Sequence, residues 1–480
     1  MSEHVLVAGA GIAGLGAALA LGDTRKVTLL DRDRAAPAGD AEDAFAHWER
    51  RGATQLRHSH VFLGRLTTLI QKRYPALLEE LLASGARIFT FEDGLPPPLR
   101  DRYVAKPGDE ELSILFSRRT TLELVMRRYV TRLPNVAILD EAGVRGVLDD
   151  GLRVERSGVM EDMTADIVVD ATGRNTPFPD WFRAKGVTVT EEESPAGILY
   201  FTRHYRLRDG AEEPTRDGTP GAGDLGYIKF GVFPADNRHF SITLAVPEIE
   251  TELRMVIVKP EIFDWVCMEI PGCARWIDPA RSEPASQVFA MGNLKSTWRV
   301  YRPEPMNFFA LGDAAVRTNP LYGRGCSAGI VHAHVLREVL DATGDPQARA
   351  AKFEVETRKV LRPYYDSMVR QDKQAIKRAA NERDPHYKPA FRARAIKSLV
   401  EDAIGPATRG DIDILRAFSR AFHMIDDPNA WWKRPDIVAK LTAFWAVPER
   451  IKRARGYYPP KFGPERAEMF SKLKLPETSA

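Results

Sequence analysis

Three glycines near the start of the chain limit the folds that it can adopt. Gly9, Gly11 and Gly14 form a Gly-x-Gly-x-x-Gly pattern. The apolar run 5–8 precedes them, and a helix-forming run, 15–21, follows. In a strand–turn–helix unit, the first glycine permits a tight turn, the second lets a pyrophosphate approach the backbone, and the third lets the helix pack against the strand. The pattern therefore predicts an α/β fold that opens with such a unit.

The residues that follow indicate that this unit binds a dinucleotide. A second apolar run, 27–30, ends at Asp31, which is 22 residues after Gly9, the spacing typical of an acid that accepts ribose hydroxyls. The free N–H groups and positive dipole end at the helix start favour phosphate. A second Gly-x-Gly-x-x-Gly, at 221–226, follows a polar loop and precedes a predicted strand. We expect a loop there and no second nucleotide-binding unit.

Composition excludes several other classes of protein. Sixty-nine Lys and Arg residues against 66 Asp and Glu give a net charge of +3, too small for the concentrated positive field of a nucleic-acid binder. The three cysteines cannot form a disulfide framework, which favours a cytoplasmic protein. The apolar N-terminus lacks a basic leader and is not expected to be a signal peptide, and no apolar run is long enough to predict a spanning helix. His332 and His334 are two apart on a predicted helix and do not share a face, so we expect no metal site.

Hydrophobic periodicity predicts the remaining elements. A long loop is expected at 35–60, helices at 63–85 and 117–133 with Ser117 as the cap of the latter, and a meander of short strands at 136–169. Further strands are expected at 198–207, 227–233, 240–246 and 308–311, separated by a long loop at 209–226 and a helical stretch at 250–270. A helix at 327–340 is followed by a helical C-terminal region.

Further motifs identify a family. They are VVDATGR at 168–174, ALGDAA at 310–315 and NPLYGRGCS at 319–327. With the glycine pattern they resemble the FAD-dependent monooxygenases of the para-hydroxybenzoate hydroxylase superfamily. Within it, the closest resemblance is to the flavin-dependent polyketide olefin epoxidases, which share the QLRHSH segment at 55–60, Ser117-Arg118 and the Y-x-T-R segment at 200–203.

The resemblance implies a fold of several parts. It predicts a Rossmann-like FAD-binding domain with an interleaved β-sheet substrate domain and a helical C-terminal region. The FAD-binding domain would comprise 1–186, with 60–115 contributing to the substrate side, and 301–345. The substrate domain would be 187–300, and the helical region 346–480.

The resemblance also assigns residues to FAD. Asp313 would bind the ribityl chain, Arg118 would lie near the phosphates, and Arg119 is expected on the surface. The start of the helix after Gly325 would stabilise the anionic reduced ring. The residues expected to bind FAD are Gly9, Gly11, Gly14, Asp31, Arg32, Arg118, Gly312, Asp313, Pro320, Gly323, Gly325 and Cys326. Asp170 to Arg174 either bind FAD or shape the fold around it.

The cluster Arg57, His58 and His60 is the candidate catalytic group. These residues either position flavin or substrate and relay a proton, or fix the conformation of their loop. The substrate would lie against the sheet of 187–300, where the predicted lining residues are Tyr200, Arg203, Phe230 and Phe240.

The expected activity is oxygen transfer through a flavin C4a-hydroperoxide to a lipophilic small molecule, by epoxidation or hydroxylation, with O2 as co-substrate. NAD(P)H would reduce FAD by transient docking or through a partner reductase. A flavin-dependent halogenase, a reductase of the geranylgeranyl reductase type, and a non-catalytic flavin-binding protein stay open as alternatives. The W-x-W-x-I-P motif and early catalytic lysine of halogenases are not visible. Trp431, Trp432 and the basic residues after them form either a membrane-surface contact or a core stripe with a solvated face.

Overall fold

A computed structural model describes residues 2–303, 307–384 and 386–475. Its first layer is a parallel sheet with the strand order β18-β9-β1-β2-β5. The five strands are β1 (His4–Ala8), β2 (Lys26–Leu30), β5 (Val136–Leu139), β9 (Ile167–Asp170) and β18 (Phe308–Ala310). Because β1 neighbours both β2 and β9, the turn after β1 lies at the centre of the sheet edge where ligands bind in such folds.

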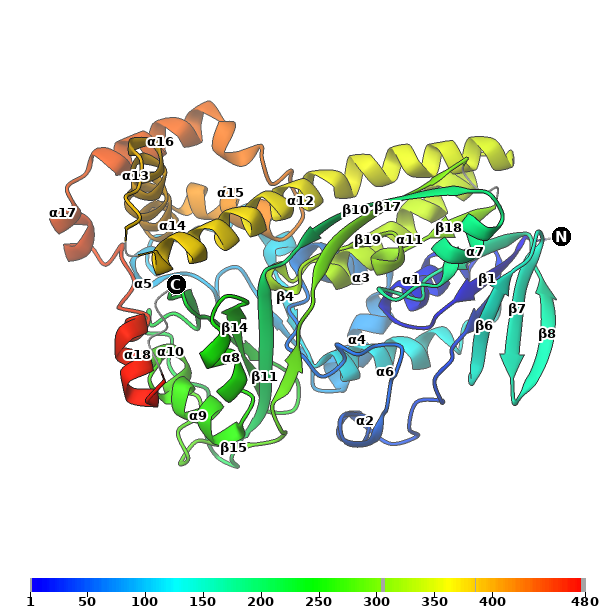
Figure 1. The fold of residues 1–480 in the computed structure, drawn as a ribbon, viewed down its shortest axis with the longest axis horizontal. Helices are drawn as coiled ribbons and strands as arrows, with labels where there is room; N and C mark the ends of the chain where they lie inside the picture. The colour runs from blue at the N-terminus through cyan, green and yellow to red at the C-terminus, as the bar shows by residue number, and fades with distance from the viewer. Residues whose placement is uncertain (1, 304–306, 385, 476–480) are drawn as a thin grey trace.

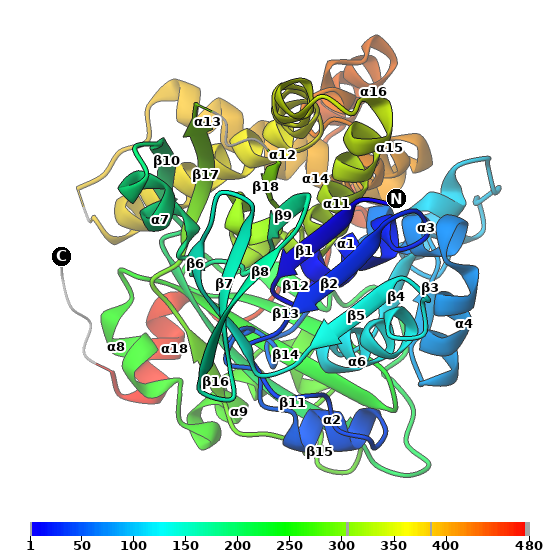
Figure 2. The ribbon, with the colours of Figure 1, turned by 90° about the vertical axis from the view of Figure 1, so that its right-hand side faces the viewer.

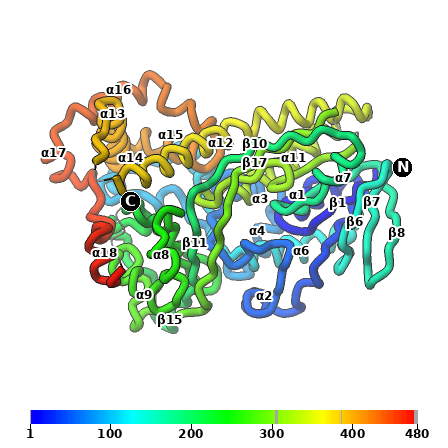
Figure 3. The backbone as a smooth tube through the Cα atoms, viewed as in Figure 1, coloured from blue at the N-terminus to red at the C-terminus, as the bar shows by residue number. Residues whose placement is uncertain are grey.

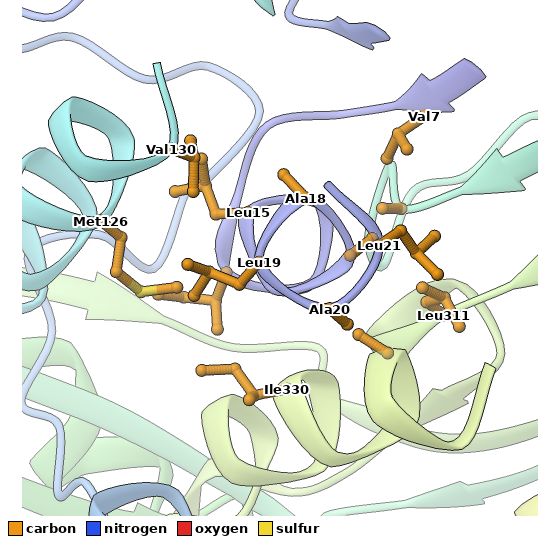
Figure 4. Packing of buried hydrophobic residues seen from close by; sticks show 14 of the residues in the cluster. Val7, Leu15, Ala18, Leu19, Ala20, Leu21, Met126, Val130, Leu311 and Ile330 are labelled. Carbon is orange, nitrogen blue, oxygen red and sulfur yellow. The ribbon is translucent and has the colours of Figure 1, made fainter. Parts of the chain in front are cut away.

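Helices cover one face of this sheet. Side chains alternate along β1, so that Val5 and Val7 face the helices while Leu6 and Ala8 face the other side. Figure 4 shows α1 between side chains of α6, such as Met126, and Ile330 of α11. The helices on this side are α1 (Ile12–Leu21), α3 (Gly64–Arg73), α4 (Pro75–Ala83), α6 (Arg119–Val130) and α11 (Gly325–Ala342).

An antiparallel meander and a short helix cover the other face (Figure 2). These elements are β6 (Ala142–Val147), β7 (Gly151–Arg156), β8 (Val159–Thr164) and α7 (Phe178–Ala184). Leu152 and Val154 of β7 pack with Leu6 and Ala8, which buries the parallel sheet on both sides.

A second, antiparallel sheet has the order β12-β13-β14-β11-β15, with β16 paired to β11. Its strands are β11 (Ile198–Leu207), β12 (Ala222–Asp224), β13 (Lys229–Pro234), β14 (His239–Pro247), β15 (Ser282–Pro284) and β16 (Phe289–Met291). One face is covered by helices α8 (Thr251–Val256), α9 (Pro260–Met268), α10 (Pro271–Ala274) and α18 (Arg466–Leu473). The other face is free to border a site.

Long strands connect the two sheets. β10 (Thr188–Pro195) pairs with β17 (Lys295–Arg302), and β17 pairs with the short β19 (Val316–Arg317). Figure 1 shows β10 and β17 running from the side of the parallel sheet toward β11. Smaller elements complete this half: β3 (Arg87–Phe89), β4 (Ile114–Phe116), α5 (Pro97–Arg100), η1 (Asp109–Leu112), η2 (Gly312–Ala314) and η3 (Pro320–Tyr322).

The C-terminal region is helical, as predicted. Its longest helix, α12, packs on α11 at one end and extends to the C-terminal helices at the other (Figures 1 and 3). The elements are α12 (Pro346–Arg383), α13 (Phe391–Ser398), η4 (Leu399–Ile404), α14 (Gly405–Gly410), α15 (Ile412–Phe422), η5 (Trp431–Lys433), α16 (Pro435–Ala446) and α17 (Glu449–Ala454).

The predicted fold class is therefore confirmed, but several local predictions were wrong. The expected loop 35–60 contains α2 (Ala41–His47), because Asp40 caps a short helix by accepting from the N–H groups of Glu42 and Asp43. The single helix expected at 63–85 breaks at Tyr74, since Pro75 starts a new helix.

Two smaller predictions also differ. Ser117 does not cap α6; Arg118 holds the cap position and Ser117 donates to the Arg118 carbonyl. The second glycine pattern is not wholly a loop, because β12 pairs with β13 there.

Candidate active site

One cavity of about 1000 Å³ lies between the carboxyl ends of the parallel strands and the free face of the second sheet. This is at the upper end of the about 300–1,000 Å³ usual for ligand pockets. Its wall includes residues 9–13, 52–55, 58–61, 171–175, 229–234, 312–313 and 320–323. The predicted dinucleotide-binding turn and the predicted substrate sheet thus line the same space.

The glycine turn has the shape that a phosphate group needs. Gly9 has a φ of +103°, and a Cβ there would lie 2.5 Å from the Ala171 carbonyl oxygen. A Cβ on Gly14 would lie 1.9 Å from the Gly9 carbonyl oxygen, so helix and turn touch. A Cβ on Gly11 would have no heavy atom within 4 Å and would project toward the cavity. Of these three glycines, only Gly11 therefore leaves open space beside the start of α1.

Asp31 lies at the cavity edge between two guanidinium groups. Its Oδ2 accepts from Arg127 Nη1 at 2.8 Å and lies 3.2 Å from Arg50 Nη2. Burial raises the pKa of Asp31, and the charges of Arg50 and Arg127 oppose that shift. Arg50 was not predicted from the sequence, since it lies in a stretch without periodicity; it also ion-pairs with Glu123 at 3.2 Å. Arg32 lines the cavity and donates to the Arg51 carbonyl.

The two arginines at the start of α6 exchange the places expected for them. Arg118 does not line the cavity; its side chain is buried on Asp236, with Nη2 2.6 Å from Oδ2, and on Glu42. Arg119 lines the cavity and is not on the surface; its Nε donates to Glu123 at 2.6 Å. Arg118 is the N-cap residue with extended backbone, whereas Arg119 is the first residue of α6, so the two side chains leave the backbone in different directions. The family motif pointed to Arg118, but Arg119 is the one that lines the cavity.

The turn before α11 supplies a second backbone wall. Gly312 has a φ of +57°, and a Cβ there would lie 2.9 Å from Ala13 Cβ, so this turn packs against the start of α1. Asp313 lines the cavity; burial raises its pKa, and the charge of Arg119 opposes that shift. Burial also raises the pKa of Cys326 to about 11, so its thiol is neutral at pH 7. The other predicted residues on this wall are Pro320, Gly323 and Gly325.

The predicted catalytic cluster is divided between cavity and loop. Arg57 does not line the cavity, because its guanidinium donates to the carbonyl groups of residues 45, 46 and 48. His58 and His60 line it. Burial lowers the pKa of His58 to about 4 and that of His60 well below its usual range, so both are neutral at pH 7. His60 bonds the His58 carbonyl through Nδ1 and Arg119 through Nε2.

Strand parity separates the four predicted substrate residues. Tyr200 and Phe230 both reach the cavity, but the Phe230 ring packs on Phe462 in the core beneath the sheet. Arg203 and Phe240 do not: Arg203 ion-pairs with Asp264 at 2.5 Å, and Phe240 stacks on Tyr205 in the core beneath the sheet. On β11 the even-numbered residues face the cavity, and on β14 the odd-numbered residues do, so the prediction for these two residues was wrong.

A buried carboxylate from the C-terminal region fixes the loop before α11. Asp372 of α12 accepts through Oδ1 from Asn319 Nδ2 and from Tyr322 OH, both at 2.9 Å. Asn319 in turn accepts from Tyr200 OH at 2.5 Å. Burial raises the pKa of Asp372 to about 6, against the hydrogen bonds from Tyr322 and Asn319. No sequence signal distinguishes this acid from the other acids of α12.

The end of α15 also reaches the site. Phe422 and His423 line the cavity, and His423 Nδ1 accepts from the Gly64 N–H at 3.1 Å. Trp431 packs partly into the core of α14 to α16, whereas Trp432 is 49% exposed. The described ranges contain no helix long and apolar enough to cross a membrane. They also contain no group of three His, Cys, Asp or Glu side chains that could hold a metal ion.

Comparisons with known proteins identify the fold. No protein-family model matches the chain. Protein Rv3254 of Mycobacterium tuberculosis is 28% identical, covering 71% of this chain and 73% of its own length. Solved structures are also similar to the chain, at low identity. p-Nitrophenol 4-monooxygenase PnpA from Pseudomonas putida is 16% identical, with a TM-score of 0.59, covering 89% of this chain and 98% of that one. The flavin-dependent brominase Bmp2 is 15% identical, with a TM-score of 0.56, covering 83% and 93%. The chain thus has the fold of flavin-dependent monooxygenases and halogenases.

Proposed function

We propose that the chain is an FAD-dependent monooxygenase that transfers one oxygen atom to a lipophilic small molecule by epoxidation or hydroxylation. The observation that carries the proposal is the continuity of the cavity, because Gly11 and Tyr200 border one space. A dinucleotide at the turn and a small molecule at the sheet would therefore meet without intervening solvent. The shared fold with PnpA and Bmp2 supports a flavin as that dinucleotide.

The residues present fit FAD. The pyrophosphate would lie at the open face of Gly11 and at the start of α1, with Arg119 supplying positive charge. Asp31 and Arg32 would face the adenosine ribose, and Asp313 the ribityl hydroxyls. The start of α11, at Gly325 and Cys326, would approach the flavin ring, and the neutral thiol would add no negative charge there. Gly9, Gly14 and Gly312 would shape the backbone around FAD. Arg118 would not contact FAD and would only stabilise the fold through its ion pairs.

When bound, FAD would supply the redox chemistry and the activation of O2. The chain would bind and orient the acceptor molecule and keep water from the reacting atoms. Phe233 and Ala245 would provide the apolar wall, and Tyr200, held by Asn319, would fix one side of the cavity. The neutral imidazoles of His58 and His60 would serve as hydrogen-bonding groups and not as charges.

We further propose the division of labour that the sequence predicts. Residues 1–186 and 301–345 would hold FAD, and 187–300 would face the substrate. Residues 60–115 would contribute to the substrate side, which His60, Val61 and Ile114 at the cavity support. Residues 346–480 would complete the wall through Phe422 and His423. NAD(P)H would act as the reductant, either by transient docking or through a separate reductase.

Rapid mixing of the reduced protein with oxygen tests the proposal. The protein is loaded with FAD, reduced without oxygen, and mixed with oxygen while the flavin absorbance is followed, with olefins and aromatic compounds as trial acceptors and halide as a control. We expect a transient oxygenated flavin species before the oxidised flavin returns, and an oxygenated product. One-step reoxidation with every acceptor favours a reductase, and a product that requires halide favours a halogenase. Failure to retain FAD would refute the proposal.

A further inference from the structure

A chain of hydrogen bonds leads from His58 across the free face of the second sheet. His58 Nδ1 lies 3.0 Å from Thr202 Oγ1, which lies 2.7 Å from Thr243 Oγ1. Thr243 Oγ1 donates to Ser59 Oγ at 2.8 Å, and Ser59 Oγ lies 2.7 Å from Ser241 Oγ. All of these residues except Ser241 line the cavity. This series of hydrogen bonds is therefore part of the wall that a substrate would touch.

The direction of one bond determines the directions of the others. A hydroxyl group has a single proton to donate. Because Thr243 donates to Ser59, it must accept from Thr202, and Thr202 must then accept from His58. The proton of His58 is consequently on Nδ1. Burial, with the charge of Arg174, lowers the pKa of His58 to about 4, so the ring carries no second proton at pH 7. Its Nε2 is a bare acceptor.

Nε2 remains available to a ligand. Among the residues that the structure describes, no donor reaches it. It is also not sealed from solvent, unlike the buried Nδ1 atoms of His204 and His239, which have no partner. His58 itself is only 8% exposed, so the atom faces the cavity and not the outer surface. A ligand that displaces water from the cavity must supply a donor to Nε2 or leave this acceptor unsatisfied, which costs free energy.

We infer that His58 Nε2 is a specificity-determining acceptor for a hydroxyl group, so that the substrate is a lipophilic molecule that carries a hydroxyl near the site of oxygen transfer. The inference rests on the proposed function for the reaction, but the binding preference is independent of oxygen transfer. Thr202 acts through His58 as a positioning residue, because it selects the Nδ1–H tautomer.

Paired probes test the preference at equilibrium. The FAD-loaded protein is titrated with 1-naphthol and with 1-methylnaphthalene, which have similar size, and binding is followed by the change in flavin absorbance. We expect about three- to tenfold tighter binding of the naphthol, as one hydrogen bond provides. His58→Leu should abolish the difference. Thr202→Val should reduce it, and Thr202→Ser, which keeps the hydroxyl group, should retain it.

Three results would overturn the inference. The first is an equal preference in His58→Leu and in the wild type, or binding of neither probe by the wild type. The second is a parallel loss of FAD affinity in His58→Leu, which would show that Nε2 faces the cofactor. The third comes from 15N NMR of histidine-labelled wild-type protein, with His58→Leu to assign the signal of His58. An Nε2–H tautomer of His58 would contradict the direction of the hydrogen bonds from His58 to Ser59. This measurement does not depend on whether Thr202→Val folds. Oxygen transfer need not occur in any of these measurements, so their failure is distinct from failure of the proposed function.

Discussion

Adding a methyl group at Gly11 should separate cofactor binding from stability. A Cβ there meets no protein atom within 4 Å and projects toward the cavity. Gly11 has a φ of −82°, which alanine adopts without strain. Alanine is a poorer N-cap than glycine by about 0.5–1 kcal/mol, but it lowers the entropy of the unfolded chain by a similar amount. Gly11→Ala should therefore change the free energy of unfolding of the FAD-free protein by less than about 1 kcal/mol.

The same methyl group would occupy the space through which a pyrophosphate approaches the start of α1. Losing one charge-assisted hydrogen bond costs about 1.5–3 kcal/mol. This corresponds to about a 10- to 150-fold weaker FAD affinity. The measurement is an FAD titration of the FAD-free protein, followed by flavin fluorescence, together with urea unfolding of both proteins.

Gly14→Ala is the matched control. Its Cβ would lie 1.9 Å from the Gly9 carbonyl oxygen, so helix and turn must separate. Overpacking of this kind costs about 1–3 kcal/mol, and this variant should lose stability even without FAD. Wild-type FAD affinity in Gly11→Ala, or an equal loss of stability in the two variants, would refute the assignment of the open face of Gly11 to phosphate.

Three further predictions concern other parts of the molecule. Arg118→Gln should lower the free energy of unfolding by about 3–5 kcal/mol, because the buried Asp236 carboxylate would lose its ion-pair partner. Arg119→Gln should lower the free energy of unfolding by less, because Glu123 keeps its ion pair with Arg50, but it should weaken FAD binding. The reverse order of stability in urea unfolding would contradict this prediction. The pKa of Asp372 in the folded protein is raised to about 6, so between about pH 4 and pH 6 the folded protein holds a proton that the unfolded chain has lost. The free energy of unfolding of the wild type should therefore fall by up to about 3 kcal/mol as pH rises through this range, and Asp372→Asn should remove that part of the decline. The same pH dependence in wild type and Asp372→Asn would refute this prediction. Phe240→Ala should destabilise the protein by about 3–5 kcal/mol, and Phe233→Ala by less, because Phe240 lies in the core whereas Phe233 is half-buried and borders the cavity; equal losses in chemical denaturation would count against this placement.

The sequence predicted the parts of the site that depend on backbone shape. Gly9, Gly11 and Gly14 are needed for reasons of local geometry, and local geometry is readable from spacing. The turn at Gly312 and Asp313 follows a buried strand, which the apolar run at 308–311 reveals in the same way. The fold class follows from these units.

Side-chain direction was less predictable. β14 is buried on both faces, so alternation could not show that Phe240 faces away from the cavity. The family motif was matched by Arg118, but which of Arg118 and Arg119 faces the cavity depends on how α6 begins and packs. Asp372 meets Asn319 across 53 residues of chain, and such a contact depends on how α12 packs, which no local pattern records.

The placement of α12 and α15 has a consequence for how the protein is made. The glycine turn is near the beginning of the chain, but Phe422 and His423 reach the cavity from its last quarter, and Asp372 of the same quarter holds the loop before α11. A nascent chain emerging from the ribosome can form the parallel sheet only after residue 310 and can close the cavity only after residue 423. Stable retention of a cofactor is thus expected late in synthesis, and a polypeptide cut after α11 should release it.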